Sequence, residues 1–178
     1  MKKTFQFITV IAIVAPVAIS ATLEPSLEES MLGKEQENSK TILAIFRAIE
    51  ERNDAQFRSL LQPDFEIHWP RSLPYGGTFR GLEPQPHGWG ATWAALQPTE
   101  AERKMDARVV AAHDDEVVVL WRQRGRTKEG DILDEEVLGL YHFSEGKLAR
   151  AQMFYFDTAP VAKFLEKAKH MTEHSLIA

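Results

Sequence analysis

The chain contains no cysteine among its 178 residues. This absence excludes disulfide bonds, a cysteine nucleophile and a lipid-modified N-terminal cysteine. Long apolar runs are scarce as well, because the run at residues 5–19 is shorter than the ~20 residues that a membrane-spanning helix needs and no later segment qualifies.

Basic residues are too few to make a surface for nucleic acid. The chain has 21 Lys and Arg against 26 Asp and Glu, a formal net charge of −5, which argues against nucleic acid and anionic membrane as partners. The six histidines lack the H-E-x-x-H spacing of a metal site, and no G-x-S-x-G, P-loop or dinucleotide-binding fingerprint is present. We therefore expect neither a metal nor a cofactor.

The N-terminus has the pattern of a Sec-type signal peptide. Lys2 and Lys3 precede the apolar run, and small residues at Ala18, Ser20 and Ala21 offer a cleavage site. We expect residues 1–21 to be removed and the protein to be secreted or periplasmic, with no membrane association after cleavage. The alternative is an uncleaved N-terminal anchor.

The remaining chain has the length of one domain. We expect a flexible acidic arm at residues 22–38, a folded domain at 39–170 and a tail at 171–178. The polar composition with Pro25 and Gly33 favours a mobile arm, although part of it can instead extend the first helix backwards.

Helical spacing comes first in this domain. From about Ser39 a helix with one buried face is indicated by Ile42, Ile45, Phe46 and Ile49. Asn53 and Asp54 can cap a second, shorter helix that runs on to Leu61 and is broken at Pro63.

Strand spacing follows. Phe65, Ile67 and Trp69 alternate with polar residues, which is typical of a half-buried strand. Residues 70–86 are rich in Pro and Gly and predict a loop, and a third helix is expected at about 87–96. Antiparallel strands are expected at about 105–112, 116–126, 132–143 and 148–157, before a helix that begins near Pro160. This order predicts an α+β fold, with helices on one face of an antiparallel sheet.

Three segments resemble a known family. Residues 136–165 form a hairpin with a Ser-Glu-Gly-Lys turn, then an aspartate and a helix; residues 70–81 end in a G-T-F-R-G run; and residues 117–130 are similar to a central strand pair. In this order they resemble the SnoaL-like domain of the NTF2-like superfamily, whose relatives include polyketide cyclase, ketosteroid isomerase and scytalone dehydratase. The resemblance implies a cone of three N-terminal helices on a curved antiparallel sheet plus a C-terminal helix, a pocket for a small apolar ligand, and a homodimer.

Asp157 is the candidate catalytic residue. The resemblance to polyketide cyclases implies that it acts as a general acid/base, which requires apolar surroundings that raise its pKa. The alternative is a structural role, because Asp157 or Thr158 is well placed to cap the helix that begins near Pro160.

The candidate pocket residues are mostly aromatic. They are Trp69, Tyr75, Trp89, Trp93, Trp121, Glu136 and Tyr155. Aromatic residues at such spacings are also typical of an ordinary core. Glu136 is included because it shares strand parity with Leu138 and Leu140, whereas His68 lies on the face opposite Trp69 and reads as an exposed strand histidine.

Trp69 departs from the family pattern. It stands before Pro70, where ketosteroid isomerases and many SnoaL-like sequences have the aspartate that serves as the base, and an indole cannot remove a proton from carbon. Three functions remain open: a cofactor-free isomerase, cyclase or hydrolase that uses acid/base chemistry, a non-catalytic protein that binds a small apolar molecule, and a dimeric interaction module with a filled cavity.

Overall fold

The computed structural model describes residues 27–81 and 95–174, so the expected signal peptide and the start of the arm lie outside it. Its elements, in chain order, are α1 (Leu27–Glu50), α2 (Asp54–Ser59), β1 (Leu61–Trp69), β2 (Gly77–Arg80), α4 (Glu100–Arg103), β3 (Arg108–His113), β4 (Glu116–Arg126), β5 (Ile132–Ser144), β6 (Lys147–Tyr155) and α5 (Ala159–His174). The predicted α+β class is confirmed.

Helix α1 begins earlier than the expected Ser39. Residues from Leu27 onward are helical, so this part of the expected arm extends the helix backwards, as in the alternative kept above. Polar contacts hold the extension to the turn after β3: Lys34 Nζ lies 2.6 Å from Asp115 Oδ1, Asn38 Nδ2 donates to the Asp114 carbonyl oxygen at 3.3 Å, and Glu35 Oε1 accepts the Asp114 N–H at 3.2 Å. Partners outside the helix can therefore order a segment whose composition alone favours disorder.

The second helix is shorter than predicted. Asn53 caps it as expected, because its side chain accepts a hydrogen bond from the Gln56 N–H at 3.1 Å. The helix ends at Ser59, however, and both Leu61 and Pro63 belong to β1. A register shift between Leu61 and Glu66 accommodates the proline, which cannot donate a hydrogen bond to the neighbouring strand.

The sheet is mixed, which corrects the antiparallel expectation. The strand order is β2-β1-β6-β5-β4-β3, and β1 pairs parallel to β6 while all other named pairs are antiparallel. β2 also corrects the sequence prediction, since it lies within the expected loop and pairs with β1 at the edge of the sheet. The hairpin at Ser144 and Lys147 is confirmed.

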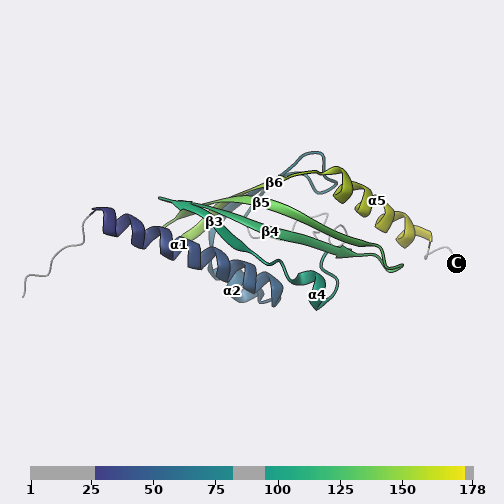
Figure 1. Ribbon diagram of the computed structural model, residues 1–178, viewed down its shortest axis with the longest axis horizontal. Helices are drawn as coiled ribbons and strands as arrows, with labels where there is room; N and C mark the ends of the chain where they lie inside the picture. The colour runs from purple at the N-terminus through teal and green to yellow at the C-terminus, as the bar shows by residue number, and fades with distance from the viewer. Residues whose placement is uncertain (1–26, 82–94, 175–178) are drawn as a thin grey trace, which may run out of the picture.

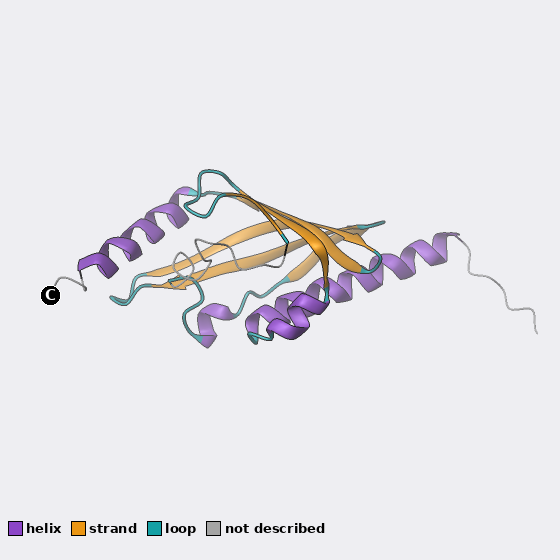
Figure 2. Ribbon diagram, turned by 180° about the vertical axis from the view of Figure 1, so that it is seen from behind, coloured by secondary structure: helices purple, strands orange, loops and turns teal. Residues whose placement is uncertain are grey.

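The sheet curves strongly, and helices cover parts of its inner face (Figures 1 and 2). α1 packs against β3, β4 and β6, while α5 reaches the far end of the same face, where Phe164 lies over Gly125. The expected third helix falls mostly on residues outside the description; of its end, Leu96 forms a bridge with Gly125 rather than a helical turn. The short α4 was not predicted.

Candidate functional site

A cavity of about 820 Å³ lies between helices α1 and α2 and the inner face of the sheet. Its volume falls within the ~300–1,000 Å³ range of small-molecule sites. Strand alternation supplies the sheet side of its wall, where inward residues of β1, β4, β5 and β6 meet, and the buried face of α1 supplies the opposite side. Most of the lining side chains in the described part of the chain are apolar.

Two of the predicted pocket residues line this cavity. Trp69 and Trp121 come from β1 and β4, and both are almost fully buried. The Trp121 ring packs against Phe46 of α1, with ring centroids 5.9 Å apart, so helix and sheet are joined at the cavity wall. Trp69 takes the inward orientation that its alternation with His68 predicted.

Tyr141 is a lining residue that the sequence analysis missed. Its side chain lies beside Gly139 of the same strand, where an added Cβ would come within 2.4 Å of the ring. The hydroxyl donates to Met153 Sδ at 3.7 Å, and burial raises its pKa while Trp121 lowers it to a lesser extent. A glycine two residues before an aromatic residue on one strand was the available signal.

Tyr75 and Tyr155 do not line the cavity; they lie behind Trp69. The ring centroid of Trp69 is 5.3 Å from that of Tyr75 and 6.4 Å from that of Tyr155. Both hydroxyls donate to Gln123 Oε1, at 3.2 Å from Tyr75 and 2.6 Å from Tyr155, and burial raises the pKa of Tyr75 to about 12. Gln123 is fully buried and was not predicted as a member of this cluster.

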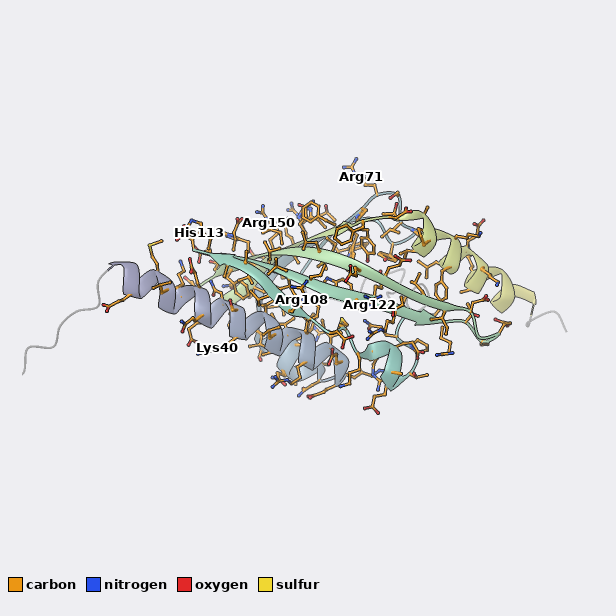
Figure 3. All side chains as sticks on the ribbon, in the orientation of Figure 1. Lys40, Arg71, Arg108, His113, Arg122 and Arg150 are labelled. Carbon is orange, nitrogen blue, oxygen red and sulfur yellow. The ribbon has the colours of Figure 1, made fainter. Side chains whose placement is uncertain are left out.

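The prediction that Glu136 faces the pocket is wrong. Its neighbour Val137 is fully buried, which places Glu136 on the outer face of β5. There the side chain is 50% exposed and its Oε1 lies 3.5 Å from Arg122 Nη1. Figure 3 labels Arg122 on this part of the sheet.

Asp157 occupies the position of a helix cap. Its side chain is exposed, and Oδ1 accepts a hydrogen bond from the Ala159 N–H at 2.8 Å, at the first residue of α5. It is not among the residues that line the cavity. This geometry matches the capping alternative, whereas the acid/base alternative needed a carboxyl group in apolar surroundings.

The three remaining candidate residues are Trp89, Trp93 and His68. Trp89 and Trp93 lie outside the described residues. His68 points to the outer face, with Nε2 3.1 Å from Glu66 Oε2 and Nδ1 3.0 Å from Thr78 Oγ1, as its parity predicted. It therefore belongs to a polar cross-strand cluster and not to the apolar cavity.

The mouth of the cavity is charged. Arg52, Asp54 and Arg58 at the corner between α1 and α2 line it and are exposed, and half-buried Arg103 lines it from α4. Arg58 Nε lies 3.4 Å from Asp54 Oδ2. The apolar interior thus opens through a rim with three arginines and one aspartate among the residues described.

Neither a metal-binding cluster nor a membrane-spanning helix is present among the described residues. No group of three His, Cys, Asp or Glu residues in this part of the chain is arranged to hold a metal ion. None of its helices has the length and apolar character needed to cross a membrane.

Comparisons with known proteins place the fold in a family. The sequence model of the SnoaL-like domain matches residues 42–151. No curated protein sequence matches the chain significantly.

Similar solved structures share little sequence with the chain. Bal32a from a soil-derived mobile gene cassette is 16% identical, with a TM-score of 0.61, and the match covers 74% of this chain and 98% of that one. A protein from Jannaschia sp. CCS1 described as a SnoaL-like polyketide cyclase is 18% identical, with a TM-score of 0.57 and coverage of 74% and 93%. TerC, co-crystallised with polyporic acid, is 20% identical, with a TM-score of 0.54 and coverage of 73% and 98%. At these identities the similarity concerns the fold alone. Because the family model covers most of the chain, from α1 to β6, the protein belongs to the SnoaL-like domain family of NTF2-like folds.

Proposed function

We propose that this protein binds a small, mainly apolar molecule in the cavity between α1, α2 and the sheet. The cavity itself carries the proposal: its volume of about 820 Å³ matches the size of a small ligand, and its mostly apolar lining is costly to leave exposed to water. TerC, a protein of similar fold, was crystallised with polyporic acid, which supports this use of the fold.

Binding without acid/base chemistry at Asp157 is the form that we propose. The Asp157 carboxylate is exposed and accepts the Ala159 N–H, so it lacks both the apolar surroundings and the position of a catalytic acid. Among the described lining residues, Asp54 is the one carboxylate, and it lies at the mouth beside Arg58. The walls deeper inside offer packing surfaces and the Tyr141 hydroxyl.

The test is to fill the cavity. Ala151 lies at its sheet wall between Ile67 of β1 and Tyr141 of β5, so in Ala151→Phe the added ring occupies the space that the ligand needs. We expect the purified protein to bind the neutral dye Nile red with saturation, and Ala151→Phe to bind it at least about tenfold more weakly, a loss of about 1.4 kcal/mol.

The matched control is Ala111→Phe, which adds the same ring at an exposed position on β3. It should leave the affinity for Nile red unchanged. Equal dye binding by Ala151→Phe and the unaltered protein would show that the dye does not occupy the cavity and would overturn the proposal.

Export is proposed on the leader sequence alone. Lys2, Lys3 and the apolar run at residues 5–19 support a Sec-type signal peptide with cleavage after Ala21. Protein recovered from the periplasm or the medium should then begin at Thr22. Intact Met1 on protein from the cytosol would contradict export.

A further inference from the structure

The charge at the cavity mouth is opposite to that of the whole chain. The sequence has a formal net charge of −5, with acidic residues in excess. The described mouth residues instead include three arginines, Arg52, Arg58 and Arg103, against the single carboxylate of Asp54. A local cationic rim on an acidic protein attracts anions to the mouth of the cavity.

Local structure holds two of these arginines at the rim. Arg52 has a positive φ of 55° just after α1, and its N–H donates to the Ile49 carbonyl oxygen, so the chain turns there towards α2. Arg103 Nε donates to the carbonyl oxygen of Glu50 at 3.0 Å, which fixes a half-buried guanidinium group beside the end of α1. Both side chains line the cavity.

Arg52 and Arg103 also retain charge for a ligand. Within the described residues no carboxylate forms an ion pair with either of them, whereas Arg58 pairs with Asp54 and Arg122 on the outer face pairs with Asp134. A guanidinium group has five donors in a planar fork that suits an oxyanion. The cavity behind this rim is lined mostly by apolar side chains, so an anionic group would lose its hydration there without gaining polar partners.

We propose that the ligand is an amphiphilic organic anion, whose apolar body fills the cavity and whose carboxylate or similar acid group binds Arg52 and Arg103 at the mouth. This inference rests on the proposed binding function and adds the chemical class and orientation of the ligand. Attraction at the border of a low-dielectric cavity is stronger than at an open surface and weakens with salt.

Three probes with the same ten-carbon chain separate the head groups. Decanoate, decanol and decylamine are titrated into the purified full chain by isothermal calorimetry at pH 7, below micelle-forming concentrations. We expect decanoate to bind about tenfold more tightly than decanol, decylamine to bind more weakly than either, and the advantage of decanoate to shrink at high salt.

Two double variants test whether the preference for decanoate depends on the arginines at the cavity mouth. Arg52→Gln/Arg103→Gln should weaken decanoate about tenfold and decanol less than twofold. The matched control is Arg47→Gln/Arg108→Gln, which removes the same charge from exposed residues that do not line the cavity; Figure 3 shows Arg108 on the sheet. It should change decanoate affinity less than twofold.

The outcomes are distinguishable. If decanol binds as tightly as decanoate, or if both double variants weaken decanoate equally, the anion assignment is wrong while the cavity-binding function stands. If none of the three probes binds, the binding function and the anion assignment both fail.

Discussion

The hydroxyl oxygens of Tyr75 and Tyr155 lie 2.9 Å apart although the two residues are separated by 80 positions in the chain. Both also donate to Gln123 Oε1, so the segment after β1 is tied to β6 and β4 by buried hydrogen bonds. Buried hydroxyl groups are tolerated because they are paired, and an ionised tyrosine here would lose its solvation.

This cluster predicts a loss of stability at high pH. Burial raises the pKa of Tyr75 from 10.0 to about 12 and also raises that of Tyr155. Above pH 10 the unfolded chain therefore releases tyrosine protons that the folded chain keeps, so the free energy of unfolding should be steady up to about pH 10 and fall as the pH rises towards 12. Urea unfolding between pH 8 and 12 measures this slope.

The control for the alkaline slope is Tyr75→Phe. This substitution removes one of the hydroxyl groups whose pKa is raised by burial. The free energy of unfolding of the variant should therefore fall less steeply above pH 10 than that of the unaltered protein. An equal slope in both proteins would contradict a contribution from Tyr75.

Gly139→Ala should destabilise the fold. The new Cβ would lie 2.4 Å from the ring of Tyr141, which Phe46 and Met153 hold in place. We expect a loss of about 1–3 kcal/mol in the free energy of unfolding, measured by urea titration.

Two variants check that reading of Gly139. In a Tyr141→Ala background the cost of Gly139→Ala should largely disappear, because the clashing ring is gone. Gly33→Ala, with open space around its Cβ position in the exposed first part of α1, should instead stabilise the fold by about 0.5–1 kcal/mol. A stabilising Gly139→Ala would show that the ring moves aside without cost.

Asp157→Ala should lower the free energy of unfolding by about 0.5–2 kcal/mol, because the Ala159 N–H loses its acceptor at the start of α5. Asp157→Asn keeps an acceptor and should cost less. Thermal unfolding gives the stability, and Nile red titration should show unchanged affinity in both. If the variants keep normal stability but lose ligand binding, Asp157 acts in the functional site and not as a helix cap.

Phe154→Glu tests the homodimer that the resemblance to the SnoaL-like family implies. Phe154 is 46% exposed on the outer face of β6, directly opposite Leu138 of β5, and an apolar pair of this kind on an open sheet face suits a subunit contact. We expect a dimer in sedimentation equilibrium and a monomer for Phe154→Glu. Leu32→Glu, on the exposed part of α1, should remain dimeric; a monomeric unaltered protein would refute the dimer.

Local patterns predicted most elements. The apolar spacing of Ile42, Ile45 and Phe46 identified the buried face of α1, and the turn between Ser144 and Lys147 identified the β5–β6 hairpin. Both depend on residues within a few positions of one another, which is the range over which spacing carries information.

Pairing between distant segments was not predictable in this way. The parallel contact between β1 and β6 joins Ile67 to Ala151, and nothing in either segment specifies the other. Likewise the mouth of the cavity combines Arg52 with Arg103, which come together only once α4 has packed against the end of α1.

The error at Glu136 has a local cause. β5 carries apolar residues on both faces, with Val137 and Tyr141 inside and Leu138 and Leu140 half-buried outside. Alternation of apolar and polar residues therefore does not distinguish the two faces. In contrast, the apolar residues of β1 up to Trp69 alternate with polar Glu66 and His68, and the inward orientation of Trp69 was predicted correctly.

The place of β6 in the sheet has a consequence for biosynthesis. It is the last strand made, yet it lies between β1 and β5. A nascent chain that stops at Gly146 holds one two-stranded piece, β1 with β2, and one three-stranded piece, β3 to β5, with no strand to join them. Without β6 the sheet is divided in two, so the complete six-stranded sheet can form only after nearly the whole polypeptide has emerged.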